Sequence, residues 1–345
     1  MPLEHRHLES SAPDGLGLYV HVPFCVQKCP YCAFASMPGL QRAGEWAAGI
    51  RREADARAAE WTRPLRTIYV GGGTPSALPP AVLGAALSGI RRHPGPEPDA
   101  ECTIEVNPAD VTPDAAAAWR ALGFNRVSVG VQALDDASLA FLGRRHDAAT
   151  AREAIATLRD NGFTNLGIDL IHGLPDQDAS TWRRTLEAAV SLAPDHLSCY
   201  GLTIEPGTPF AHAVATRRMP ASDDDRVADL FLLADAILTA AGFEHYEVSN
   251  YALPGRRSRH NSAYWSGTPY VGLGPAAHSF DGVSRKWNAP TLDAWLAGLD
   301  RNAPLGEGCE RPTHGQRTLE SLALGLRTSD GIDVALLAAR PEATA

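Results

Sequence analysis

Three cysteines in one short stretch constrain this chain more than any other feature. Cys25, Cys29 and Cys32 are separated by three and then two residues, and an apolar alternating run ends just before them. Thiolates suit zinc or an iron–sulfur cluster. A structural zinc site normally closes with a fourth Cys or His, but Phe34 stands two residues after Cys32. Three thiolates can instead bind three irons of a [4Fe–4S] cube and leave the fourth iron open. A zinc knuckle and unrelated buried thiols are the alternatives.

Composition excludes several classes of protein. The chain has 345 residues and a net charge of −9, so it has no general basic footprint for nucleic acid. Six cysteines, three of them clustered, do not resemble a secreted disulfide framework. Residues 1–14 are polar, and we expect them to be disordered rather than a secretory signal. The sequence contains no run of about 18 apolar residues, so we expect no membrane-spanning helix. We therefore expect a cytoplasmic protein.

Strand-like and helix-like segments alternate along the first two thirds of the chain. Predicted strands cover 16–24, 66–70, 102–106, 126–132, 165–171 and 196–200. Predicted helices follow them at 40–61, 80–92, 112–122, 149–160, from about 180, and from about Ser222 to Ala241. This alternation predicts an α/β fold with a parallel sheet. Element order alone does not separate a partial (β/α)6 barrel from a doubly wound sheet.

The residues that end these strands favour the barrel. Each predicted strand is followed by something polar or glycine-rich: the cysteine loop, GGGTP at 71–75, Glu105, Gln132, Asp169 and Thr203. In a barrel these ends converge on one face, where active sites lie. Glu105 and Asp169 stand within strands where apolar residues are expected. Buried carboxylates are rare without a partner, which favours a functional interpretation.

The pattern changes after Ala241. Residues 245–251 suggest a further strand, and three arginines, Arg256, Arg257 and Arg259, precede HNSAYW at 260–265. A tight loop at 272–279 and helices near 292–300 and 314–326 follow. We therefore predict a barrel over 15–243 and a small α-rich C-terminal extension over 244–345 that packs on it.

Eight motifs together carry a family resemblance. They are YVHVPFCVQKCPYCAF, YVGGGTPS, TIEVNP, VSVGVQ, GIDLIHGLP, HLSCYGLTIEPGTP, HNSAYW and GLGPAAHS, in this order between Gly17 and Trp295. They closely resemble the radical S-adenosylmethionine (radical-SAM) family of oxygen-independent coproporphyrinogen III oxidases and their relatives, the HemW-type heme chaperones. The resemblance implies a partial (β/α)6 radical-SAM barrel with an additional C-terminal domain.

The resemblance also implies cofactor-binding residues. Cys25, Cys29 and Cys32 would ligate a [4Fe–4S] cluster, with S-adenosylmethionine on its open iron. The residues that match family contacts to this cofactor are Tyr19, Tyr31, Gly72, Glu105, Thr203 and His278. The residues that match a second S-adenosylmethionine site are Gly73, Thr74, Gln132, Arg144 and Asp169. Simpler roles compete: GGGTP as an ordinary turn, Gln132 as a partner of a strand end, and Arg144 as a solvated charge.

HNSAYW matches a pattern of the chaperones. His260 would be an axial heme ligand, and Tyr264 and Trp265 would pack on the porphyrin. Taken alone, His260 is more often a structural histidine. The arginine patch could pair with propionates, although a solvated surface is the default.

Two functions of different classes follow from the resemblance. An oxidase would decarboxylate porphyrinogen propionates to vinyl groups, whereas a chaperone would bind heme and pass it to acceptor proteins. Phe34 stands where the oxidases have a fourth cysteine, only 24 residues precede Cys25, and HNSAYW matches the chaperones. These features favour the chaperone. The apparent second-cofactor residues leave radical chemistry open, and a radical-SAM methyltransferase is a third alternative. Expected partners are heme, unidentified acceptors that include a transient membrane protein, and an electron donor.

Overall fold

One twelve-stranded sheet organises the molecule, with the order β14-β13-β12-β11-β1-β4-β5-β6-β7-β8-β10-β9. The computed structural model describes residues 15–61, 63–90, 94–221, 223–301 and 308–332. The predictions for residues 1–14 and for Ser222 lie outside these ranges. Six parallel strands form the centre of the sheet: β1 Leu16–Val22, β4 Leu65–Gly72, β5 Pro96–Val106, β6 Arg126–Gln132, β7 Leu166–His172 and β8 His196–Gly201.

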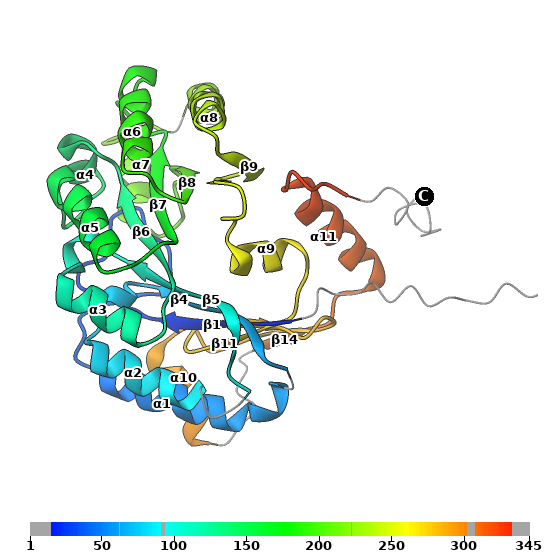
Figure 1. The fold of residues 1–345 in the computed structure, drawn as a ribbon. Coiled ribbons are helices and arrows are strands. Elements are labelled where there is room, and N and C mark those ends of the chain that lie inside the picture. The colour runs from blue at the N-terminus through cyan, green and yellow to red at the C-terminus, as the bar shows by residue number, and fades with distance from the viewer. Residues whose placement is uncertain (1–14, 62, 91–93, 222, 302–307, 333–345) are drawn as a thin grey trace, which may run out of the picture.

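Each central strand lies beside its predecessor in the chain, so the crossovers advance in one direction. A doubly wound sheet would reverse direction part-way. Figure 1 shows that the strands curl around a concave face. The predicted α/β partial barrel is therefore confirmed, and the structure decides the alternative that element order left open.

Helices cover the convex face of the sheet (Figure 1). The main ones are α1 Ala43–Ala56, α2 Pro80–Ile90, α3 Pro113–Ala121, α5 Ala148–Asp160, α6 Ala179–Ser191 and α8 Asp224–Ala240. Thr112, Asp147 and Asp178 each accept a hydrogen bond from a backbone N–H of the first turn, which explains where three of them begin. Two short helices, α4 Asp136–Phe141 and α7 Pro209–Ala215, were not predicted.

Side-chain alternation along the strands separates the core from the concave face. In β6, Val127, Val129 and Val131 are fully buried in the core beneath the helices. The residues between them point the other way, since successive side chains of a strand face opposite sides. The concave face is consequently polar, and it is the face on which a site can be built.

A short two-stranded sheet brackets the cysteine loop. Its strands are β2 Phe24–Cys25 and β3 Met37–Pro38, which pair in parallel. Strand β2 follows the end of β1 after one residue, and the loop continues from it. Its position is therefore set by the end of a central strand and not by a free connection.

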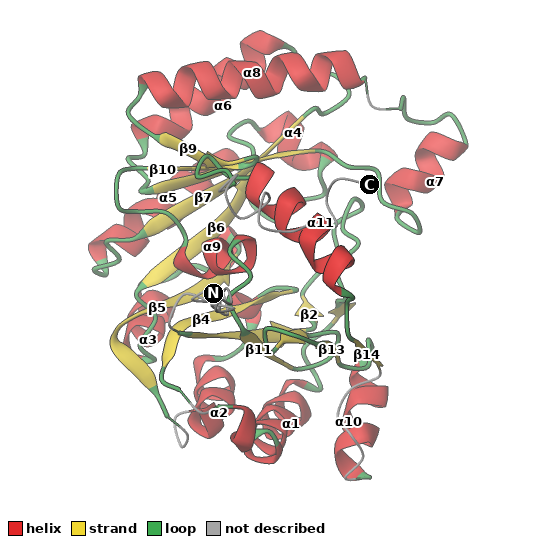
Figure 2. Cartoon of the chain, turned by 90° about the vertical axis from the view of Figure 1, so that its right-hand side faces the viewer, coloured by secondary structure: helices red, strands yellow, loops and turns green. Residues whose placement is uncertain are grey.

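The C-terminal region flanks both edges of the barrel sheet. Its elements are β9 Glu244–Glu247, β10 Asn250–Ala252, α9 Arg259–Trp265, β11 Tyr270–Leu273, β12 His278–Phe280, β13 Arg285–Trp287, α10 Leu292–Asp300, β14 Gly308–Glu310 and α11 His314–Leu326. The predicted helices are present, but the single strand expected at 245–251 is an antiparallel pair. Strands β11 to β14 were not predicted, because each has only three or four residues. Figure 2 shows α11 crossing the open side of the barrel, with α9 behind it.

A buried carboxylate joins this region to the barrel. Glu53 of α1 is fully buried and accepts hydrogen bonds from Gly274 N (2.8 Å), Asn288 Nδ2 (2.7 Å) and Trp295 Nε1 (3.0 Å). Arg57 donates to it as well, at 3.2 Å. Burial raises the pKa of Glu53, although Arg57 opposes the rise. The C-terminal strands are thus held through hydrogen bonds in addition to sheet pairing. Among the described helices, none has the length and apolarity needed to span a membrane.

Candidate functional site

A cavity of about 590 Å³ occupies the concave face. This volume is typical of a site for a small molecule or cofactor. Twelve of the predicted site residues line it: Cys25, Cys29, Tyr31, Cys32, Gly72, Gly73, Thr74, Glu105, Gln132, Arg144, Asp169 and Thr203. Eleven of them come from five strand ends and the cysteine loop, and Arg144 comes from the connection between α4 and α5. The predicted convergence of the strand ends at one face is therefore confirmed.

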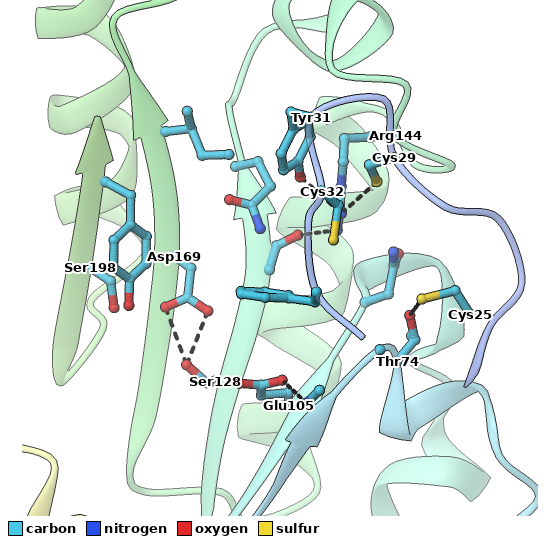
Figure 3. Close-up of a pocket in the computed structure, with 18 of the residues that line it drawn as sticks. Cys25, Cys29, Tyr31, Cys32, Thr74, Glu105, Ser128, Arg144, Asp169 and Ser198 are labelled. Carbon is cyan, nitrogen blue, oxygen red and sulfur yellow. Dashed lines mark hydrogen bonds between the residues drawn. The ribbon is translucent and has the colours of Figure 1, made fainter. Parts of the chain in front are cut away.

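The cysteine loop presents its three thiols to this cavity (Figure 3). Two of the sulfurs accept long hydrogen bonds: Cys25 Sγ from Thr74 Oγ1 at 3.4 Å and Cys29 Sγ from Arg144 Nη1 at 3.5 Å. Burial raises the pKa of the Cys32 thiol. All three cysteines are free of disulfides. The sulfurs are therefore available as ligands.

The same thiols do not form a ready single-ion site. Across the described part of the chain, no three His, Cys, Asp or Glu side chains are grouped as ligands of one metal ion. A cluster that takes one thiolate for each iron does not need its protein ligands to meet at one point. The arrangement suits a cluster better than a zinc knuckle.

The GGGTP turn packs against the start of the cysteine loop. Gly72 has φ +113°, a conformation that favours glycine, and its N–H donates to Glu105 Oε2 at 3.0 Å. A Cβ on Gly73 would lie 2.4 Å from the carbonyl oxygen of Phe24. The turn therefore needs glycine for close backbone approach, and this packing brings Thr74 to Cys25.

Two carboxylates line the cavity wall, and each has a hydroxyl partner. Glu105 Oε1 accepts from Tyr69 Oη at 2.7 Å, and Asp169 accepts from Ser128 Oγ at 3.1 and 3.2 Å (Figure 3). Burial raises the pKa of Glu105 to about 7, and the nearby Asp169 adds to the rise. Burial also raises the pKa of Asp169. Each of the two strand carboxylates therefore has a hydroxyl partner inside the protein, and their functional role stays a prediction.

Arg144 belongs to the cavity wall and is not a solvated helix-end charge. Its Nη2 donates to Gly130 O at 2.7 Å, and Nη1 lies 3.5 Å from Tyr31 Oη. Gln132, at the end of β6, has φ +70° and also lines the cavity. These contacts place a cation beside Cys29.

Two predicted cofactor contacts lie outside the cavity lining. The hydroxyl of Tyr19 donates to His21 Nδ1 at 3.0 Å, and His21 Nε2 donates to Ala35 O at 2.8 Å. Tyr19 therefore reaches the cysteine loop only through His21. His278 is exposed on β12, where its ring stacks on Trp287 with centroids 6.0 Å apart. The structure does not bring His278 to the other site residues.

The HNSAYW motif forms α9, a closed cluster on the concave face. His260 is 1% exposed, and burial lowers its pKa to about 3. Its Nδ1 lies 2.8 Å from Thr67 Oγ1 and its Nε2 lies 2.9 Å from Tyr264 Oη. Trp265 packs under the guanidinium of Arg327, 4.6 Å from the ring centroid. Both imidazole nitrogens of His260 already have partners.

The neighbouring arginine patch is also paired. Arg257 contacts Glu244 at 3.2 Å and Asp330 at 3.0 Å. Arg256 lies 3.6 Å from Asp195, and Arg259 lies 3.6 Å from Asp99. These surface pairs are weak individually. They nevertheless favour a solvated surface over a patch that is free to pair with propionates.

Comparisons with known proteins identify the family of this chain. The sequence profile of the Radical SAM superfamily matches residues 19–189. Heme chaperone HemW of Mycobacterium tuberculosis is 38% identical over 98% of this chain and 88% of that protein. HemW of Escherichia coli is 40% identical over 76% of this chain and 69% of that protein. This chain belongs to the HemW-type radical-SAM proteins.

A solved structure supports the same assignment. The Escherichia coli coproporphyrinogen III oxidase HemN, described as a radical SAM enzyme, aligns with a TM-score of 0.82 and 26% identity. The alignment covers 94% of this chain and 78% of HemN. The likeness extends beyond the barrel into the C-terminal region of this HemW-type chain.

Motif reasoning missed a second set of cavity residues. Arg126, Ser128, His196, Ser198, Tyr200 and Asn261 all line the cavity. A signal for most of them exists in the sequence. In the two strands Arg126–Gln132 and His196–Gly201, polar residues alternate with apolar ones, which marks a face directed away from the helices.

Proposed function

We propose that this chain is a heme chaperone, which binds heme and transfers it to acceptor proteins while holding a [4Fe–4S] cluster and S-adenosylmethionine. The observation that carries the proposal is the similarity over 98% of the chain to a relative named as a heme chaperone. The absence of a cysteine at Phe34, noted in the sequence, points the same way.

The residues present fit the cluster. Cys25, Cys29 and Cys32 supply three thiols from one loop beside one cavity. The hydroxyl of Thr74 and the guanidinium of Arg144 each donate toward a sulfur and would stabilise negative charge there. When bound, the cluster supplies one electron for reductive cleavage of S-adenosylmethionine. The chain itself positions the thiols through the contact of His21 with Ala35.

The wall of the cavity fits S-adenosylmethionine. Tyr31, Gly72 and Glu105 lie near the cysteine loop, and Thr203 lines the same cavity. Glu105 would accept hydrogen bonds from an amine or a ribose. The second-cofactor candidates, Gly73, Thr74, Gln132, Arg144 and Asp169, line the cavity too. We propose that Tyr19 acts only by orienting His21, and we assign His278 no contact with the cofactor.

Heme contacts by His260, Tyr264 and Trp265 require a rearrangement. Both ring nitrogens of His260 are hydrogen-bonded inside the molecule. Ligation of heme iron would therefore require one of these hydrogen bonds to break and the buried ring to become accessible. We expect a packing role for His260 in this conformation. A His260→Ala variant separates packing from heme ligation, since the first role affects stability and the second affects heme affinity.

Oxidation of coproporphyrinogen III is the second candidate. It is favoured by the structural alignment with HemN and by the presence of Gln132, Arg144 and Asp169 in the cavity wall. The two functions differ in what becomes of the tetrapyrrole. A chaperone releases heme unchanged, whereas an oxidase removes carboxyl groups from a porphyrinogen.

One experiment tests both candidates. Anaerobically reconstituted protein is titrated with heme and, separately, incubated with coproporphyrinogen III, S-adenosylmethionine and a reductant. We expect saturable heme uptake near one equivalent and no protoporphyrinogen. Decarboxylation without specific heme uptake would overturn the chaperone proposal.

The remaining partners follow from this function. We propose an electron donor for the cluster and acceptor proteins for heme, with a transient membrane-protein acceptor among them. A cytoplasmic location is proposed from the cysteine pattern. No nucleic-acid partner is proposed, because the chain carries a net charge of −9.

A further inference from the structure

Arg126 is a buried cation at the inner end of the cavity. It begins β6, is 1% exposed and lines the cavity. Its Nε has no hydrogen-bond partner, and its guanidinium forms no ion pair with any described residue. A buried guanidinium without direct partners is costly, and such exceptions need an explanation. The group is free to bind a ligand.

Two carboxylates near Arg126, Glu101 and Asp169, are occupied by other donors. Glu101 Oε1 and Oε2 accept the backbone N–H groups of His260 and Arg259, at 3.0 and 3.1 Å. Asp169 accepts from Ser128. Both carboxylates influence Arg126 through space, since their charges favour its protonated form. Neither fills the hydrogen-bonding positions of its guanidinium.

His196 provides a second open donor. The hydroxyl oxygen of Tyr246 accepts from Ser258 N at 3.4 Å and lies 2.7 Å from His196 Nε2. We infer that the Tyr246 hydroxyl donates to Nε2, the acceptor within its reach, so that the imidazole hydrogen lies on Nδ1. That Nδ1 is buried and has no partner among the described residues. Burial lowers the pKa of His196, so the ring is neutral.

These donors meet above Gly167 of β7. A Cβ placed on Gly167 would lie 3.3 Å from Arg126 Nη2, 3.5 Å from His196 Nδ1 and 3.6 Å from Ser128 Oγ. The missing side chain leaves a small space bordered by two N–H donors. Asn261 of α9 lines the same cavity, and no described residue hydrogen-bonds its side-chain amide.

We propose that Arg126 and His196 bind a carboxylate group of a ligand in the space above Gly167. A guanidinium and an imidazole N–H both donate, and a carboxylate accepts from both. The identity of the ligand rests on the proposed function. A carboxylate in this cavity comes either from a tetrapyrrole propionate or from an amino-acid group such as that of a second S-adenosylmethionine.

The first arm tests the tetrapyrrole source. Heme and heme dimethyl ester are titrated into reconstituted wild type and the variants Arg126→Gln and Gly167→Ala. We expect wild type to bind heme about tenfold more tightly than the ester, since hydrogen bonds to charged groups are strong. Both variants should lose this preference. Arg152→Gln is the control, because Arg152 lies outside the cavity lining and donates to the backbone oxygens of Ala148 and Leu134.

The second arm tests the amino-acid source. Equilibrium binding of S-adenosylmethionine is measured on the same proteins. Loss of one bound equivalent in Arg126→Gln and Gly167→Ala, with the control unchanged, would assign the site to an amino-acid carboxylate. If both variants match wild type in both arms, the proposal is wrong.

The variants also separate this proposal from the proposed function. Absence of heme uptake by wild type would refute the chaperone, while the second arm would still test the carboxylate site. Gly167→Ala guards against misfolding of Arg126→Gln, since its methyl group would meet neighbours at 3.3 Å or more. Thermal unfolding of each protein confirms that it is folded before titration.

Discussion

The cysteine loop and α9 both carry residues typical of metal ligands, but they differ in what the fold has done with them. The thiols of Cys25 and Cys29 face a cavity and accept only hydrogen bonds of 3.4 and 3.5 Å. The imidazole of His260 is enclosed and bonds through both nitrogens at 2.8 and 2.9 Å. A ligand residue is useful only if its lone pair is free. From this comparison we propose metal chemistry for the loop and a packing role for α9.

The largest expected effect concerns the cysteine loop, whose thiols face the cavity. Replacement of Cys29 by Ala removes one of three thiols, and we expect the reconstituted variant to lose most of its iron. Iron and sulfide analysis with the visible absorption spectrum checks this. Cys309→Ala is the control, since Cys309 is exposed on β14, away from the cavity. Equal iron content in Cys29→Ala and wild type would refute the assignment of the cluster.

The next effect concerns α9, where both ring nitrogens of His260 are hydrogen-bonded. We expect His260→Ala to destabilise the protein by about 2–4 kcal/mol, since it leaves a cavity and unpaired hydroxyls. Heme affinity should stay within about threefold of wild type, because the ring is not open to ligand. Chemical unfolding and heme titration measure the two quantities. A large loss of heme affinity with unchanged stability would show that α9 opens to bind heme.

Acidification sharpens the same test. The folded-state pKa of His260, about 3, lies below its ordinary value of 6.5. Its stabilising contribution is therefore present above pH 6.5 and is lost as the pH falls toward 3. The stability difference between wild type and His260→Ala should shrink in this range.

The smallest effect concerns Glu105, which lies between the two regions. Its folded-state pKa of about 7 exceeds the ordinary 4.5, so its contribution to stability is favourable below pH 4.5 and is lost as the pH rises through 7. In cofactor-free protein, Glu105→Gln should raise the free energy of unfolding by about 1–2 kcal/mol at pH 8. The gain should vanish near pH 4. An equal gain at both pH values would contradict a perturbed carboxyl.

The cavity illustrates how far local patterns reach. The spacing of the cysteines and the polar ends of the strands predicted ten residues that line it, and the family resemblance added Tyr31 and Arg144. Local patterns are sufficient here, because strand order and chirality always bring the carboxyl ends of parallel strands together. His278 follows no such rule. It lies on β12, between the short strands β11 and β13, where its ring stacks on Trp287 of β13.

The short strands β11 to β14 were beyond sequence patterns for a related reason. Segments of three or four residues have too few alternations to be recognised, and they form because β1 offers them an edge. Glu53 and its partners from the C-terminal region likewise meet only in three dimensions.

The sequence by itself determined the α/β class, the thiol loop and the family, since each rests on residues close together or on motifs in a fixed order. Only the tertiary structure decided which polar groups were left without partners. It closed His260 against Thr67 and Tyr264, and it left Arg126 and His196 open above Gly167. Hydrogen bonds between distant segments set these differences, and no local pattern encodes them.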